Sequence, residues 1–362
     1  MTRISATRAF VNGALTGPLS VSWDATGRIT AVTAIQVADA EFDAILVPGF
    51  IDLQVNGFGS FNVSASDATQ WSQADQYLLR AGVTSWCPTL VSAPLHAIDS
   101  SLMTIQEQMN DRSTRDSNAR TSIIGAHVEG PFLGEAIGAH VKDSVRDVDL
   151  NWIAGLSDCV ALMTIGAEQK QAQEAIRLLR KKGIAVSIGH TLASEQEYLS
   201  AKIAGAQMVT HLYNAMSGVH HRDHGIALDV LTDDEIYASI IVDLEHVSNR
   251  AVRLAFSAKP DRMIMVSDSV RSISDRAPRL KNGTLAGSVL SLDQALRNAV
   301  FQCSVSLTHA LESVTKNPAH VLGLKDRGEI KIGMRADLVL LDENLAVVRT
   351  ISNGLLNNTL ND

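Results

Sequence analysis

Carboxylate and imidazole side chains stand at the ends of short apolar segments in the middle of this 362-residue chain. Glu129, His190, His211 and Asp268 each occupy such a position. One carboxylate and two imidazoles suit a catalytic zinc ion that keeps one position open for water. Such an ion lowers the pKa of its water and polarises a carbonyl group, and Asp268 could take the proton and deliver it to a leaving nitrogen. The pattern therefore predicts metal-dependent hydrolysis.

These four groups need a scaffold that brings the segment ends together. Eight short apolar segments recur along the chain, at Leu46–Val55, Val83–Pro88, Ile123–Val128, Val160–Ile165, Ile184–Ile188, Met208–Leu212, Ile240–Val242 and Met263–Val266. Stretches with helical character separate most of them, the clearest being Ala68–Arg80, Gln171–Lys182, Ser194–Ala204 and Val247–Ala258. This alternation predicts an α/β fold, a (β/α)8 TIM-like barrel, with a doubly wound sheet as the competing arrangement. A barrel collects its chemistry at the C-terminal ends of its strands, where the four groups fall.

The two ends of the chain differ from the middle. Residues 1–46 and 326–362 alternate short β-like stretches with turns, and neither part could bury a sheet face alone. We therefore expect both ends to pair in one small β-sandwich-like domain beside a catalytic barrel formed by residues 47–325.

Each candidate residue also has a plain structural interpretation. A lone histidine is usually structural, and an isolated aspartate after a strand often caps the segment that follows. Here, however, metal-ligand side chains occur at three strand ends and an aspartate occurs at a fourth. This combination favours a catalytic metal site over the structural interpretation.

Composition narrows the classes of function. The net charge of −8 argues against broad attraction to nucleic acid or an anionic membrane, although a pocket can be locally positive. No apolar run reaches the roughly 20 residues that span a bilayer, and the N-terminus lacks a signal-peptide pattern. The odd, scattered set of three cysteines is typical of free thiols in a reducing compartment. We expect a cytoplasmic protein.

Longer motifs surround the candidate residues. They are PGFIDLQVNGFGS from Pro48, HVEGPFL from His127, SIGHT from Ser187, THLYNAMSG from Thr210, VSDS from Val266, GTLAGS from Gly283, NPAHVLGL from Asn317 and GEIKIGMRADLVLLD from Gly328. In this order, and over almost the whole chain, they resemble the N-acetylglucosamine-6-phosphate deacetylases of the amidohydrolase superfamily. HVEGPFL and THLYNAM are highly specific, whereas many amidohydrolases share the ADLVLLD ending. The resemblance implies hydrolysis of the acetamide of N-acetyl-D-glucosamine 6-phosphate to D-glucosamine 6-phosphate and acetate.

The resemblance also implies roles for individual residues. Glu129, His190 and His211 correspond to the metal ligands, and Asp268 to the catalytic acid and base. His140, which alone would be interpreted as a surface-loop histidine, corresponds to a residue that stabilises charge on the acetyl carbonyl. The implied substrate-binding positions are Ala139, His140, Asn214, Ala215, Arg222, His246, Leu285, Ala286 and Gly287. Arg222 corresponds to an arginine that the neighbouring subunit of a homodimer brings to the phosphate, a role that suits a guanidinium with two parallel donors.

The expected metal content is one ion per subunit. Binuclear amidohydrolases hold a second metal through two histidines on the first strand, where this chain has Gln54 and Asn56. Neutral amide oxygens are poor replacements for imidazole as zinc ligands. We expect Gln54 and Asn56 to hydrogen-bond the strand end and the water network around a single divalent ion, with zinc as the expected metal.

The chain departs from the family pattern near the expected pocket. Gly166-Ala167-Glu168 replaces Ala-Pro-Glu, Asp243-Leu244-Glu245-His246 replaces Asp-Gly-x-His, and the segment 269–282 is shorter. Glu245 would oppose a phosphate if it pointed inward. The galactosamine epimer or another N-acetyl amino sugar, a cyclic amide and an inactive scaffold remain alternatives. Cyclic-amide hydrolases usually carry His-x-His on the first strand, which this chain lacks, and an inactive scaffold need not keep the four site residues.

Overall fold

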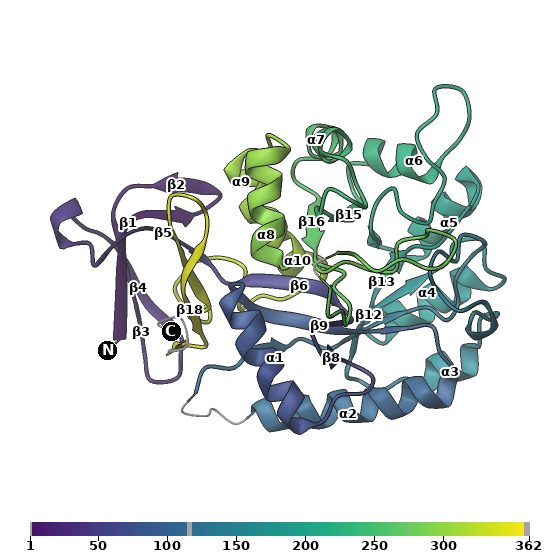
Figure 1. Cartoon of the computed structure of the whole chain (residues 1–362), viewed down its shortest axis with the longest axis horizontal. Helices are drawn as coiled ribbons and strands as arrows, with labels where there is room; N and C mark the ends of the chain where they lie inside the picture. The colour runs from purple at the N-terminus through teal and green to yellow at the C-terminus, as the bar shows by residue number, and fades with distance from the viewer. Residues whose placement is uncertain (1, 114–117, 275, 358–362) are drawn as a thin grey trace.

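The first of two large sheets joins the two ends of the chain. The computed structural model describes residues 2–113, 118–274 and 276–357 (Figure 1). The strands of this sheet are β1 (Thr2–Val11), β2 (Ala14–Thr16), β3 (Leu19–Trp23), β4 (Ile29–Ala34), β5 (Phe42–Pro48), β17 (Leu338–Leu341), β18 (Val347–Ser352) and β19 (Leu355–Leu356). β5 lies between β1, to which it is parallel, and β17, to which it is antiparallel. Figure 1 shows the purple N-terminal strands beside the yellow C-terminal strands, so the predicted small β domain is confirmed.

Alternating burial explains the β-like patterns at the chain ends. In β3, the apolar residues Leu19, Val21 and Trp23 are buried, whereas the intervening Ser20 and Ser22 are half-buried. A two-residue period places successive side chains on opposite faces of a sheet. One face of β3 therefore packs into a small core, which also includes Leu46 of β5 and Leu338 of β17.

The second large sheet is a nearly closed barrel of parallel strands. They are β6 (Phe50–Val55), β9 (Val83–Val91), β10 (Ser122–Ile123), β11 (Ala126–Glu129), β12 (Val160–Ile165), β13 (Ala185–Ile188), β14 (Met208–Val209), β15 (Tyr237–Ile241) and β16 (Met263–Val266). The barrel closes between the last residues of β6 and the segment after β16, where the Asp268 N–H donates to the Gln54 carbonyl at 2.9 Å. The predicted (β/α)8 barrel is confirmed, and the doubly wound sheet is excluded.

Helices surround the barrel and bury the outer faces of its strands (Figure 1). They are α1 (Ala68–Arg80), α2 (Leu95–Ser113), α3 (Leu150–Gly155), α4 (Ala172–Lys181), α5 (Glu195–Ala204), α6 (Ile226–Thr232), α7 (Asn249–Ala258), α8 (Leu292–Arg297), α9 (Leu307–Val314) and α10 (Lys316–Val321). Shorter elements are the 3-10 turns at Val37–Asp39 and Lys142–Ser144, a π-helical turn at Asn298–Gln302 and the hairpin of β7 (Gly57–Phe58) and β8 (Phe61–Asn62). Within the described residues, no helix is long and apolar enough to cross a bilayer.

Six of the eight predicted strand segments have different bounds in the structure, and two of the differences have a clear physical reason. The apolar run from Leu46 to Val55 is divided at Gly49, where the chain passes from the small sheet into the barrel. A Cβ atom at Gly49 would lie 2.2 Å from the Thr84 hydroxyl oxygen, so the crossing requires a residue without a side chain. The seventh barrel strand begins at Tyr237, three residues before the predicted start, because its polar Ser239 still faces the buried interior.

Candidate active site

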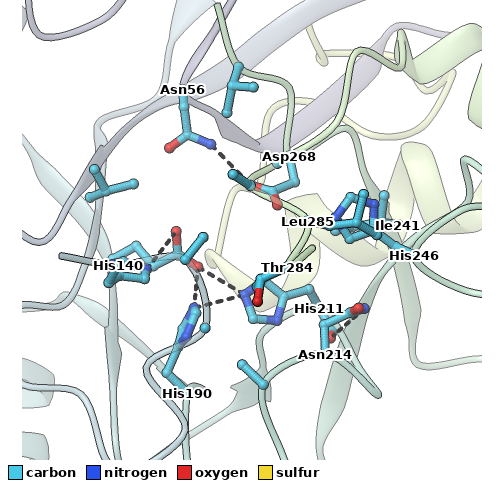
Figure 2. A pocket seen from close by; sticks show the side chains of 18 of the residues that line it. Asn56, His140, His190, His211, Asn214, Ile241, His246, Asp268, Thr284 and Leu285 are labelled. Carbon is cyan, nitrogen blue, oxygen red and sulfur yellow. Dashed lines mark hydrogen bonds and ion pairs between the residues drawn. The ribbon is translucent and has the colours of Figure 1, made fainter. Parts of the chain in front are cut away.

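Glu129, His190 and His211 meet at the C-terminal mouth of the barrel. Figure 2 shows the two histidines side by side. Oε1 of Glu129 lies 3.2 Å from Nε2 of His190 and 3.1 Å from Nε2 of His211, and the two Nε2 atoms are 3.0 Å apart. Each of the three side chains is at most 6% exposed. Three donor atoms at these separations can surround one ion at normal zinc–ligand distances of roughly 2.0–2.1 Å. The three predicted ligands are thus brought together.

The hydrogen bond of the His190 Nδ1 atom indicates which kind of ligand the cluster can bind. Nδ1 of His190 lies 3.2 Å from the Ala136 carbonyl oxygen, which can only accept a hydrogen bond. Nδ1 therefore carries the proton, and Nε2 presents a lone pair toward the oxygen of Glu129. Two lone pairs that face each other in a buried site repel unless a cation lies between them. The residues accordingly fit a divalent metal ion.

Left-handed backbone conformations aim these side chains into the mouth. His190, His211 and Asp268, each two residues beyond its strand, have φ values of 50°, 33° and 46°. Such conformations cost residues other than glycine about 1–3 kcal/mol each and cluster at functional sites. At each of these residues the chain turns away from the strand direction. The side chain can therefore point back over the opening of the barrel.

Asp268 lies beside the cluster and is connected to it through an amide. Its Oδ1 accepts hydrogen bonds from Nε2 of Gln54 and Nδ2 of Asn56, both at 3.0 Å, and Gln54 Nε2 also donates to Glu129 at 2.9 Å. Burial, followed by the negative charge of Glu129, raises the pKa of Asp268 to about 8 in the metal-free chain. In these hydrogen bonds, the Gln54 amide donates to both carboxylates and the Asn56 amide donates to Asp268.

A cavity of about 400 Å³ opens over these groups, in the size range of small-molecule sites. Figure 2 shows Asn56 and Asp268 on one side and the three imidazoles of His140, His190 and His211 on the other. The predicted substrate-binding residues that line the cavity are Ala139, His140, Asn214, Ala215, His246, Leu285, Ala286 and Gly287. Arg222 does not: it is exposed on the loop before α6, which stands out from the barrel in Figure 1.

Several lining residues were not predicted from the sequence. They are Val91, Ser92, Gly138, Val141, Ile241, Val270 and Thr284. Val91 and Ser92 stand at the C-terminal end of β9, so the strand-end rule that selected Glu129 also applied to them. They were missed because a valine and a serine carry no distinctive metal or acid–base signal.

His140 belongs to the site rather than to a free surface loop. Its Nδ1 lies 2.8 Å from Oγ of Ser92, and its Nε2 lies 3.9 Å from Oε2 of Glu129. Burial lowers the pKa of His140 to about 4, although the charge of Glu129 opposes the shift. His140 is therefore neutral at pH 7 and can act as a hydrogen-bond donor without carrying charge.

His246 is positioned by the loop that departs from the family pattern. Its Nδ1 lies 2.6 Å from Oδ2 of Asp243, whose other oxygen accepts the N–H groups of Glu245 and His246. Leu244, which stands at the family's glycine position, adopts a φ of 68°. Glu245 pairs with Arg279 at 3.3 Å and does not line the cavity, so its charge does not oppose a ligand there.

Glu168 connects two loops of the site. One carboxylate oxygen accepts the backbone N–H groups of Glu135 and Leu192 at 3.0 and 2.8 Å, and the other accepts the hydroxyl of Thr191. Glu135 begins the loop that leads to His140, and Thr191 follows His190. The carboxylate therefore holds the loop that leads to His140 against the loop that follows His190.

The geometry agrees with comparisons to known proteins. The amidohydrolase family model matches residues 45–357. Human N-acetylglucosamine-6-phosphate deacetylase is 34% identical over 89% of this chain and 86% of its own length. The N-acetylgalactosamine-6-phosphate deacetylase of Escherichia coli O157:H7 is 30% identical over 89% of this chain and 90% of its own length.

A solved structure of a deacetylase is also similar to this chain over nearly its whole length. A mutant N-acetyl-D-glucosamine-6-phosphate deacetylase from Mycobacterium smegmatis, in complex with N-acetyl-D-glucosamine-6-phosphate, superimposes with a TM-score of 0.89. The two proteins are 28% identical, and the match covers 99% of each chain. The predicted resemblance is confirmed: this chain belongs to the metal-dependent amidohydrolase family and, within it, to the N-acetylglucosamine-6-phosphate deacetylases.

Proposed function

We propose that this protein hydrolyses the acetamide of N-acetyl-D-glucosamine 6-phosphate to D-glucosamine 6-phosphate and acetate. The observation that carries the proposal is the cluster of Glu129, His190 and His211 beside Asp268 at the base of one cavity. The human and bovine relatives, at 34% and 35% identity, carry the name of this activity, which supports the choice of substrate.

Three groups of side chains have separate roles in the proposed reaction: the metal ligands, Asp268 and His140. A divalent ion held by Glu129, His190 and His211 would activate a water molecule and polarise the acetyl carbonyl. Asp268 takes a proton as the water oxygen attacks the carbonyl carbon, and it returns that proton to the nitrogen as the C–N bond breaks. His140 donates a hydrogen bond to the carbonyl oxygen as negative charge develops there. The C–N cleavage gives acetic acid and the free amine, and transfer of the acid proton to the amine leaves acetate and the ammonium form, so atoms and protons balance.

We propose one zinc ion per subunit. The amide N–H groups of Gln54 and Asn56 point at carboxylates, and their neutral amide oxygens are poor zinc ligands, so these two side chains do not supply a second ion with strong ligands. A cation at Glu129 would also offset the negative charge that raises the Asp268 pKa, which favours the carboxylate form that the first proton transfer requires.

We further propose a homodimer in which Arg222 reaches the phosphate in the neighbouring subunit's cavity. Among the described residues, the cavity lining includes neither lysine nor arginine, so a cation for the phosphate has to come from outside that lining. Arg222 is exposed on a projecting loop.

The three cysteines are buried free thiols, which suits the reducing cytoplasm that we propose as the location of the protein.

The galactosamine epimer is the second candidate substrate, because an N-acetylgalactosamine-6-phosphate deacetylase is among the relatives at 30% identity. Acetate release from both N-acetylhexosamines, each with and without the 6-phosphate, tests the choice. We expect the gluco 6-phosphate to have the highest kcat/KM. A higher value for the galacto epimer would reassign the substrate, and release from none of the four would reject the proposed reaction.

A further inference from the structure

Ser92 touches His140 through two different atoms. It follows β9 directly, is 6% exposed and lines the cavity. Its backbone nitrogen lies 3.3 Å from Nδ1 of His140, and its Oγ lies 2.8 Å from the same atom. A Cβ atom on Gly130 would lie 2.2 Å from this Oγ, so the residue after Glu129 leaves the space that the hydroxyl occupies.

These two contacts determine which nitrogen of the His140 ring carries the proton. A backbone N–H can only donate, so Nδ1 has to present its lone pair to Ser92. A proton on Nδ1 would face the proton of that N–H. With Nδ1 as the acceptor, the Ser92 hydroxyl donates to it as well, and Nε2 carries the only ring proton. Nε2 is also the atom on the Glu129 side of the ring.

We propose that Ser92 is a positioning residue that holds His140 in the tautomer with the proton on Nε2, so that this proton faces the acetyl carbonyl oxygen. The inference rests on the proposed deacetylation and adds the group that orients its hydrogen-bond donor. In the other tautomer, Nε2 would turn a lone pair toward the carbonyl oxygen, and the developing negative charge would be repelled.

The tautomer is measurable without turnover. In zinc-loaded protein labelled with ¹⁵N-histidine, long-range ¹⁵N–¹H spectra distinguish a protonated from an unprotonated ring nitrogen, and the spectrum of H140Q assigns the His140 signals. We expect an unprotonated Nδ1 and a protonated Nε2. A protonated Nδ1 in the wild-type protein would overturn the proposal. Because this readout is independent of acetate release, it stands even if the proposed reaction fails.

Variants at position 92 test the positioning role. Ser92→Ala keeps the backbone donor but removes the closer hydroxyl, so we expect a shifted Nδ1 resonance and a kcat about tenfold lower, with a smaller change in KM. Ser92→Thr should restore both, because it keeps the hydroxyl. Ser5→Ala, which removes a buried hydroxyl in the small β domain, is the matched control. An unchanged resonance together with an unchanged kcat in Ser92→Ala would contradict the role.

Substitutions of His140 itself provide an independent test. The amide nitrogen of glutamine can take the place of Nε2, whereas that of asparagine takes the place of Nδ1. His140→Gln should therefore keep about tenfold more activity than His140→Asn. Equal activities, or a more active asparagine variant, would show that the donor is not Nε2.

Discussion

Glu129 and Asp268 accept hydrogen bonds from the same amide nitrogen of Gln54, at 2.9 and 3.0 Å. The proposed metal ligand and the proposed acid–base group are therefore held by one side chain at the end of the first barrel strand. This connection explains why the charge of Glu129 contributes to the raised pKa of Asp268. Because Glu129 belongs to β11 and Asp268 follows β16, each carboxylate can be altered separately to distinguish metal binding from proton transfer.

Asp268→Asn should abolish turnover while leaving the metal bound. The amide keeps the shape of the side chain but cannot take a proton from water, and positioned proton transfer contributes about 10²–10⁴-fold to the rate. Acetate release and elemental analysis of the purified variant test both parts. Asp234→Asn, at an exposed position, is the control. Activity near that of the wild-type protein would remove Asp268 from its assigned role.

Zinc should stabilise the wild-type protein by binding only its folded state. Free zinc at 100 times its Kd adds about 2.7 kcal/mol to the free energy of unfolding. Thermal unfolding of metal-stripped protein, with and without zinc, measures this effect as a rise in Tm. Glu129→Gln should lose most of the rise, whereas Glu107→Gln, exposed on α2, should keep it. An equal rise in all three proteins would place the zinc elsewhere.

Arg222→Ala should raise KM for the phosphorylated substrate and leave kcat nearly unchanged. A charge-assisted contact with phosphate contributes about 1.5–3 kcal/mol, which corresponds to a KM roughly ten- to a hundredfold higher. Arg253→Ala, exposed on α7, serves as the control. Steady-state kinetics and sedimentation of both variants provide the measurement. A fully active monomer would contradict the shared site.

Leu244→Gly should stabilise the protein by about 0.5–1 kcal/mol. Leu244 has a φ of 68° and is 36% exposed, so glycine would relieve an unfavourable backbone conformation while exposing little additional apolar surface. The greater freedom of glycine in the unfolded chain offsets part of the gain. Leu244→Ala, which retains a Cβ atom, should show no such gain in chemical denaturation. A stabilised alanine variant would assign the effect to the leucine side chain instead.

Asp52 should make stability depend on pH. Burial raises its pKa from 3.8 to about 6 in the folded chain, so the folded state binds this proton more tightly than the unfolded state does. The resulting stabilisation is complete below pH 3.8 and is lost as the pH rises through 6. Between pH 5 and pH 7, wild-type protein should lose about 1.3 kcal/mol that Asp52→Asn does not lose. Denaturation of the two metal-stripped proteins measures the difference, and parallel pH profiles would disprove it.

The sequence was sufficient for the barrel and for its strongest chemistry because both depend on residue type and order. Glu129, His190 and His211 could be selected from strand ends alone, since the barrel rule requires no knowledge of the loops. Helix α2 was not predicted. Its buried Ile98, Leu102 and Ile105 have helical spacing, but the large apolar Met103 lies exposed off that face and weakens the contrast between the two sides of the helix.

Contacts between distant loops could not be derived in this way. Ser92 and His140 are 48 residues apart, and their pairing depends on how two loops fold over the mouth. The left-handed conformations of His190 and His211 are likewise imposed by tertiary structure, because neither residue type favours a positive φ strongly enough to predict one. The sequence indicated the candidate ligands, but not the turns that orient them.

The central position of β5 in the first sheet has a consequence during synthesis. One edge of β5 pairs with β1, which precedes it, but the other edge pairs with β17, which begins only at Leu338. A nascent chain therefore carries an open, apolar strand edge while the whole barrel is being translated, and open edges of this kind invite pairing with other chains. Premature termination anywhere before residue 338 would leave that edge permanently uncovered, so truncated products of this chain should aggregate even where their barrels are complete.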